Sequence, residues 1–322
     1  MEDYPRPRLV VSRCLGFESC RYNDQVIRDS FVAELRNYAD CITPCPEADI
    51  GLGVPRFPVR LVQRDNQVRL LQSESEKDCT EDMVSFSEAF LKKNRPVDGF
   101  ILKYRSPSCG QKEVKIYPRL GKVAPLGKGP GIFTREVEKY YPDLPLENEG
   151  RLKNYKIRYR FYSRIFTLAR FRGVKAAENM KHLVEFQARH KFLLLAYDEQ
   201  GMRDLGRIVA NQEGLAVGEV LDKYAAKLRK TLTGQSTRKT NINVMMHMGG
   251  YFSETNSKRE KDYLEESFEL YREGRIPLSS VLSIIRTWAL RDQNDYLLNQ
   301  YYLTPFPQDL LELKDSGRQI EL

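Results

Sequence analysis

The sequence predicts a Rossmann-like α/β domain with a mainly parallel sheet, followed by an all-α domain. In the first 145 residues, short apolar runs alternate with segments of helical period, which is typical of parallel strands joined by helices. The segment 141–150 then brings two prolines and an acidic cluster, and beyond it almost every segment has helical period. We therefore expect one domain over residues 1–145 and a helical domain over residues 146–322.

The expected strands of the first domain are short and apolar, and they cover residues 8–12, 67–71 and 98–103. Between them, residues 24–38 and 81–94 have apolar side chains at helical spacing and predict amphipathic helices. A loop rich in glycine, proline and lysine follows over residues 121–131, and a further helix is expected after it.

The second half of the chain predicts helices in close succession. Its helical periods cover residues 151–172, 175–196, 202–211, 216–231, 240–252, 260–272 and 278–290. The tail at residues 301–307, Y-Y-L-T-P-F-P, holds two prolines and is expected to be irregular.

The charge of the chain is concentrated in one block. Residues 151–200 hold 12 Lys and Arg against 4 Asp and Glu, so this block carries the whole net charge of +8. Such a block favours a polyanionic partner, although a set of solvated helix faces explains it equally well. No apolar run is long enough to cross a membrane, and the N-terminus lacks the apolar region of a signal peptide. We expect a cytoplasmic protein without a membrane partner.

Three cysteines lie in proline- or glycine-containing loops, each at the end of a predicted strand. They are Cys14 in S-R-C-L-G, Cys45 in P-C-P-E and Cys109 in S-P-S-C-G, 31 and 64 residues apart. An α/β fold brings such loops to one edge of its sheet. Three thiolates meeting there could hold an iron–sulfur cluster with one iron left open, whereas an ordinary electron-transfer cluster takes four.

Other readings of the cysteines are weaker. Zinc usually takes a fourth protein ligand and short paired spacings, and the pair Cys41 and Cys45 has no matching second pair. Cys20 and Cys79 stand among polar residues without a motif and are interpreted as spare cysteines. Glu47 follows Cys45 by two residues and is a possible general base, although a loop-stabilising acid is the simpler interpretation.

The quoted motifs resemble the thiouracil desulfurase family. The resemblance is carried by S-R-C-L-G with C-R-Y-N, then by C-P-E-x-x-I-G-L-G-V-P-R and by K-x-R-S-P-S-C-G, over about residues 8–145. The second half is similar to the helical domain often fused to that family, through F-Q-A-R-H-K-F-L-L-L-A, T-N-I-N-V-M-M-H-M-G-G-Y-F and the Y-Y-L-T-P-F-P tail. This fused arrangement is similar to that of the tRNA 4-thiouridine desulfidases.

The resemblance implies a 4Fe–4S cluster that is held by Cys14, Cys45 and Cys109 and used without redox change. It places the catalytic carboxylate on Glu47 and the catalytic serine on Ser106. Arg13 departs from the family pattern, in which a small residue is usual, and we expect this departure to alter the substrate pocket.

The expected function is therefore the desulfuration of 4-thiouridine in tRNA to uridine, with release of hydrogen sulfide. Desulfuration of free thiouracil or a thionucleoside is an alternative, and so is a non-catalytic iron–sulfur protein that binds RNA. Basic and aromatic residues alternate over residues 155–171, which suits either RNA contact or a helix with an aromatic core face. The expected tRNA contacts are Arg158, Arg189, His190, Lys191, Arg238 and Lys239.

Overall fold

The structure is a computed structural model that describes residues 4–311, so residues 1–3 and 312–322 at the ends of the two expected domains lie outside the described part. Its chain divides into two compact units. We call residues 6–161 the N-terminal unit and residues 1–5 with 162–322 the C-terminal unit. The division lies 16 residues later than the predicted boundary at 145/146.

Residues 146–161 belong to the N-terminal unit because their side chains pack into it. Glu149 binds the ammonium of Lys103 and accepts the backbone N–H of Tyr104 at 2.9 Å. The guanidinium of Arg158 lies 3.9 Å from the ring centroid of Phe31. The expected linker is therefore an integral part of the first unit.

The first sheet of the N-terminal unit is parallel throughout. It consists of β1 (Arg8–Val11), β2 (Asp40–Ile42), β5 (Gly99–Ile101) and β8 (Leu146–Glu147), in the order β2-β1-β5-β8. Val10 pairs with Ile42 on one side and with Phe100 on the other. The expected strands at 8–12 and 98–103 are confirmed, and the predicted linker contains β8.

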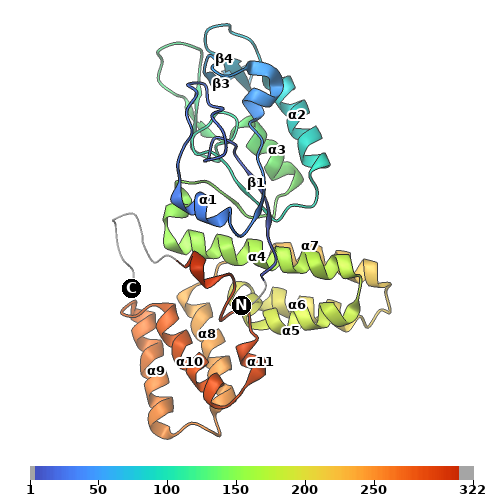
Figure 1. Cartoon of the computed structure of the whole chain (residues 1–322), viewed down its shortest axis with the longest axis vertical. Helices are drawn as coiled ribbons and strands as arrows, with labels where there is room; N and C mark the ends of the chain where they lie inside the picture. The colour runs from blue at the N-terminus through green and yellow to red at the C-terminus, as the bar shows by residue number, and fades with distance from the viewer. Residues whose placement is uncertain (1–3, 312–322) are drawn as a thin grey trace. The chain divides into compact units, whose positions relative to one another are not determined.

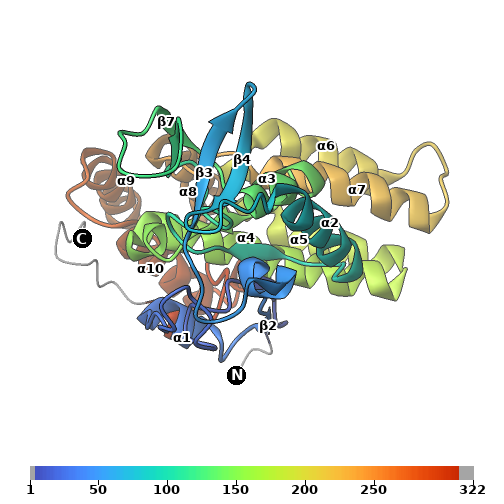
Figure 2. The same cartoon turned by 90° about the horizontal axis from the view of Figure 1, so that it is seen from above.

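The second sheet is mixed. Its strands are β3 (Val59–Arg64), β4 (Gln67–Gln72), β6 (Val114–Tyr117) and β7 (Gly127–Gly129), in the order β4-β3-β6-β7. Strands β3 and β4 form a hairpin that projects in Figure 2. Its turn residues Asp65 and Asn66 both have positive φ, as a tight hairpin turn requires. Only β4 was expected, and β7 lies in the segment predicted as a loop.

Three helices cover these sheets: α1 (Ser30–Leu35), α2 (Thr80–Lys93) and α3 (Ile132–Tyr140). Helices α2 and α3 lie side by side in Figures 1 and 2, and the rings of Phe90 and Phe133 meet edge to face between them. Helix α1 is much shorter than the predicted 24–38. It begins only after Asp29, whose carboxylate caps the N–H of Val32 at 3.1 Å. Single-turn helices lie at Ala48–Leu52 (η1) and Arg151–Lys153 (η2).

Most of the described chain beyond residue 154 is helical, as predicted. Helix α4 (Tyr155–Ala177) runs from the first unit into the second. The helices that follow are α5 (Met180–Tyr197), α6 (Glu199–Ala210), α7 (Val217–Leu232), α8 (Arg238–Gly249), α9 (Lys258–Glu273), α10 (Leu278–Arg291) and α11 (Asp295–Leu298), with single turns at Gly250–Phe252 (η3) and Gln308–Leu310 (η4).

The C-terminal unit has a continuous apolar core. Side chains of α5, α8, α9 and α10 meet there, among them Phe192, Met245, Phe268, Ile285 and Trp288. Figure 1 shows α8, α9 and α10 packed together, and α5, α6 and α7 packed side by side. The predicted α/β plus all-α fold class is thus confirmed. Within residues 4–311, no helix is both long enough and apolar enough to span a bilayer.

Candidate metal centre

The three loops that carry the candidate cysteines follow three adjacent parallel strands. Cys14 comes three residues after β1, Cys45 three residues after β2 and Cys109 eight residues after β5, and β1 is the central strand of the three. Backbone hydrogen bonds join these loops, with Arg13 N–H donating to Pro44 O at 2.9 Å and Ser12 N–H to Ile101 O at 3.0 Å. The parallel pairing therefore places all three cysteines at the same edge of the sheet.

The three side chains are buried thiols. Cys14 and Cys45 are 9% exposed and Cys109 is 5% exposed, and none of them forms a disulfide. Burial raises the pKa of the Cys109 thiol above its ordinary range, and a contact with the Cys20 thiol, followed by burial, raises that of Cys45. Thiols that are protonated without metal become thiolates when they bind it.

These residues fit an iron–sulfur cluster better than a single ion. Among residues 4–311, no three His, Cys, Asp or Glu side chains converge closely enough to hold one metal ion. A cluster does not require that convergence, because each cysteine binds a different iron atom. The donor set of three buried thiols in one loop region is the soft set that such clusters take.

The loop of Cys109 is fixed by its own serine and by α3. Ser106 Oγ accepts the N–H groups of Ser108 at 3.2 Å and of Cys109 at 3.1 Å, so it stabilises the turn. Thr134 Oγ1 donates to Cys109 O at 2.7 Å. A Cβ at Gly131 would lie 2.4 Å from Ser108 O, so only glycine permits this close approach of helix and loop.

Arg13, which departs from the family pattern, joins the loops of Cys14 and Cys45. Its Nε donates to Thr43 O at 2.9 Å, and its Nη2 lies 2.9 Å from a carboxylate oxygen of Asp49. The other oxygen of Asp49 accepts the N–H of Cys45 at 3.0 Å. Arg13 therefore has a structural role at the sheet edge.

Glu47 lies at the centre of a hydrogen-bond network in this region. Its Oε1 accepts from Ser108 Oγ at 3.0 Å and from Ser106 Oγ at 3.4 Å. Its Oε2 forms an ion pair with Arg56, with a distance of 2.7 Å to Nη2. The Glu47 side chain is 13% exposed and that of Arg56 only 3%. Burial disfavours the charge of Arg56, but the Glu47 carboxylate outweighs it and the pKa of Arg56 is raised.

Sequence reasoning missed Arg56, gave the catalytic role to Ser106 and not to its neighbour Ser108, and gave no role to Cys20. Ser108 lies closer to Glu47 than Ser106 does, and Arg56 pairs directly with Glu47. Cys20, interpreted as a spare cysteine, is 3% exposed, and its main-chain oxygen lies 3.4 Å from Cys45 Sγ. All three stand inside the quoted motifs, which was the available signal. Cys79 is buried at the start of α2, with its thiol on Lys77 O.

The expected tRNA contacts fall into two groups. Lys191, Arg238 and Lys239 have exposed side chains, and that of Arg189 is 31% exposed. Arg158 and His190 do not offer the exposed charge that a phosphate contact needs. Arg158 is 2% exposed and donates to Leu152 O at 2.8 Å, and His190 is fully buried between the rings of Phe186 and Tyr301. Burial lowers the pKa of His190 well below its ordinary value.

The aromatic residues of α4 in the C-terminal unit form a core face, so this part of the helix follows the simpler of the two interpretations. Phe171 stacks on Tyr224 and meets Phe186 edge to face, and Phe166 packs on Phe306. Arg170, on the same helix, lies 3.7 Å from the ring centroid of Tyr301, and burial lowers its pKa to about 10. These rings are therefore not available to stack on RNA bases.

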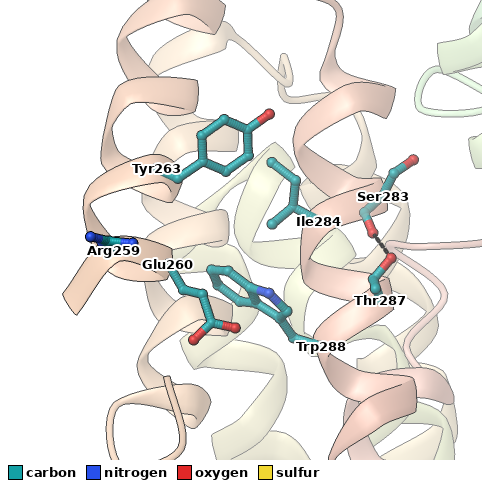
Figure 3. A pocket seen from close by; sticks show the side chains of 7 residues that line it. All are labelled: Arg259, Glu260, Tyr263, Ser283, Ile284, Thr287 and Trp288. Carbon is teal, nitrogen blue, oxygen red and sulfur yellow. Dashed lines mark hydrogen bonds between the residues drawn. The ribbon is translucent and has the colours of Figure 1, made fainter. Parts of the chain in front are cut away.

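A separate groove lies between α9 and α10 in the C-terminal unit. Its volume is about 450 Å³, and Tyr263, Ile284 and Trp288 face into it in Figure 3. The other lining residues are Arg259, Glu260, Ser283 and Thr287. None of the candidate residues lies in this groove, and its lining contains no thiol or imidazole that could bind a metal.

Comparison with known proteins finds one family match in each part of the chain. Residues 9–149 match the family described as 2-thiouracil desulfurase. The chain therefore carries a 2-thiouracil desulfurase domain at its N-terminus. Residues 191–307 match the family described as "Protein of unknown function (DUF1722)". The two family matches lie on the α/β part and on the helical part, as the resemblance implied.

Individual relatives cover parts of the chain. The uncharacterized protein YbgA of Escherichia coli is 26% identical over 136 residues, which are 42% of this chain and 80% of YbgA. The uncharacterized protein YbbK of Bacillus subtilis is 28% identical over 109 residues, 32% of this chain and 72% of YbbK. Among solved structures, the 4Fe-4S-dependent thiouracil desulfidase TudS is 23% identical, with a TM-score of 0.38, over 46% of this chain and 93% of TudS.

Proposed function

We propose that this protein removes the sulfur of 4-thiouridine in tRNA, using a 4Fe–4S cluster held by Cys14, Cys45 and Cys109. The observation that carries the proposal is the placement of these three buried thiols after adjacent parallel strands, beside a carboxylate with two serine partners. The family of the N-terminal domain supports desulfuration as the reaction class. Three protein ligands leave one iron open, and an iron of this kind is a Lewis acid toward a thiocarbonyl sulfur.

Glu47 is the proposed general base of the reaction. Water replaces sulfur at carbon four of the pyrimidine, so a thione and water give a carbonyl and hydrogen sulfide, and no electron is transferred. Glu47 Oε1 is positioned to accept the proton of the attacking water, while Arg56 holds Oε2 at 2.7 Å. The hydroxyl of Ser106 or Ser108 can turn from Glu47 toward the substrate and stabilise the charge that develops there.

The proposed tRNA partner is supported by the charge of the chain. The basic block at residues 151–200, which includes the exposed Lys191, carries the net charge, and Arg238 and Lys239 add exposed cations in the C-terminal unit. Lysine and arginine on a surface bind phosphates and release counterions from them. A cytoplasmic site of action suits the proposal, because free thiols persist in a reducing compartment.

The second candidate is desulfuration of free 2-thiouracil or a thionucleoside, which the name of the matched family favours. The test is anaerobic reconstitution with iron and sulfide, followed by initial rates on 4-thiouridine tRNA, 4-thiouridine and 2-thiouracil. We expect hydrogen sulfide and uridine from the tRNA at the highest kcat/KM. Turnover of the small thiones alone would favour the second candidate. A stable cluster with tRNA binding and no turnover of any thione would show a non-catalytic RNA-binding protein.

A further inference from the structure

A row of basic side chains crosses the second sheet of the N-terminal unit, where β6 lies between β3 and β7 (Figure 2). Lys115 of β6 and Lys128 of β7 are partners in the antiparallel register, so their side chains leave one face of the sheet directly opposite each other. Strands β3 and β6 pair in parallel with Leu61 opposite Ile116. The residues one position earlier, Arg60 and Lys115, therefore lie level with each other on that same face.

The two lysines of this row have no acid to neutralise them. Both are exposed, and like charges directly opposite each other on a sheet are destabilising. Among residues 4–311, neither lysine forms an ion pair. Residues 112–128 hold five Lys and Arg and one acid, Glu113. The carboxylate of Glu113 binds the backbone instead, because it accepts the N–H groups of Arg105 at 3.2 Å and of Lys112 at 2.9 Å. A pair that costs stability here needs another reason.

The third cation of the row is held in place and keeps its charge. Arg60 Nη1 donates to Gly121 O at 2.8 Å, and the Arg60 guanidinium lies 5.1 Å from the ring centroid of Tyr117. Tyr117 follows Lys115 by two residues on β6 and therefore shares its face of the sheet. Neighbouring strands are about 4.8 Å apart, so the three cations span about 10 Å at their base. Cations in a row beside an aromatic ring suit RNA, because the cations contact phosphates and the ring contacts a base.

We propose that Arg60, Lys115 and Lys128, with Tyr117, form a surface of the N-terminal unit that binds the phosphate backbone of the tRNA substrate. This inference rests on the proposed function, since it takes tRNA as the substrate. A lysine on an edge strand such as β7 also prevents pairing with another sheet. The two roles respond differently to charge reversal, because a glutamate protects an edge as well as a lysine does but repels phosphate.

The test is charge reversal at each lysine in the full-length, reconstituted protein. Lys115→Glu and Lys128→Glu each turn the like-charge pair into an opposite-charge pair, so both variants should melt at or above the wild-type temperature. Binding is measured on tRNA without 4-thiouridine, which is bound but not turned over. Each variant should lose affinity on the order of tenfold at 0.1 M salt, and the slope of log affinity against log salt concentration should fall by about one.

Activity assays separate this surface from the catalytic site. For each variant, kcat/KM on 4-thiouridine tRNA should fall by the same factor as the affinity, while the rate on free 4-thiouridine stays at the wild-type value. Lys93→Glu is the matched control, because Lys93 is an exposed lysine of the same unit, on α2. This control should change neither tRNA binding nor kcat/KM.

The outcomes distinguish the surface from the function on which it rests. Wild-type tRNA affinity in both variants, with tRNA still desulfurated, would overturn the surface alone. An equal loss of affinity in Lys93→Glu would also overturn it, because the effect would then be one of net charge. Weaker binding in the two variants only, with no turnover of any thione by the wild type, would support the surface and overturn the desulfuration. A wild-type chain that does not bind tRNA would overturn the tRNA substrate and the surface together.

Discussion

The buried ion pair between Glu47 and Arg56 should contribute strongly to stability. Replacing Arg56 by Met leaves the Glu47 carboxylate, 13% exposed, without its cation, and leaves the carbonyls of Cys20 and Gly53 without their donor. Breaking a buried pair in this way costs about 3–5 kcal/mol. Because Glu47 keeps some contact with solvent, we expect about 3 kcal/mol, near the lower end of that range.

The assay is urea unfolding of protein without cluster, under anaerobic conditions, followed by circular dichroism. With a slope of about 2 kcal/mol per molar urea, the midpoint of Arg56→Met should fall by roughly 1.5 M. Arg56→Lys keeps the charge but loses the paired N–H groups, so its loss should be smaller. Arg69→Met is the control, because its partner Glu81 is 82% exposed and such pairs contribute about 0–1 kcal/mol.

A double substitution tests whether the interaction itself is responsible. If the pair is coupled, Glu47→Gln with Arg56→Met should destabilise the protein by less than the sum of the single changes. The reasoning would be refuted if the single losses were additive, or if Arg56→Met shifted the midpoint no more than Arg69→Met does.

Four further predictions concern the site and the helical part. Cys109→Ala should lower the iron content of the reconstituted protein and abolish turnover, whereas Cys79→Ala should do neither. Iron analysis checks this, and full iron content in Cys109→Ala would show that Cys109 is not a cluster ligand. Glu47→Gln should keep the visible absorption of the cluster but lose roughly two to four orders of magnitude in kcat, and a near-normal rate would place the base elsewhere. Lys191→Glu or Arg238→Glu should weaken tRNA binding and lower the slope of log affinity against log salt concentration by about one. Lys93→Glu in α2 is the control and should leave tRNA binding unchanged. Unchanged binding for all three variants would contradict the proposed tRNA surface. Burial lowers the pKa of His190 in the folded protein, so below about pH 6.5 only the unfolded chain binds a proton at this residue. The free energy of unfolding should therefore fall by about 1.4 kcal/mol for each pH unit below that value. His190→Gln should lose this slope, whereas His182→Gln, at an exposed position, should keep it.

Much of this protein could be predicted from local sequence patterns. The apolar runs before Cys14 and Cys109 are strands, and the helical periods beyond residue 150 are helices, because both patterns reflect burial of one side of a local element. The alternation of strand and helix was enough to predict a parallel sheet. Parallel pairing in turn places successive strand ends at one edge, and this predicts that Cys14, Cys45 and Cys109 lie at the same edge of the sheet.

The tertiary structure decided what depends on contacts between distant segments. β8 is two residues long and forms only because Leu146 pairs with Phe100 of β5, so a segment with linker composition became part of the sheet. The partners of Glu47 come from 9, 59 and 61 residues away, and no local pattern reports such distances. Cys20 stands in a polar stretch of sequence that reads as exposed, yet the packing of its loop against Cys45 and Arg56 buries it. The sequence alone thus determined which residues have the chemistry of a cluster site, whereas packing decided which neighbours surround them.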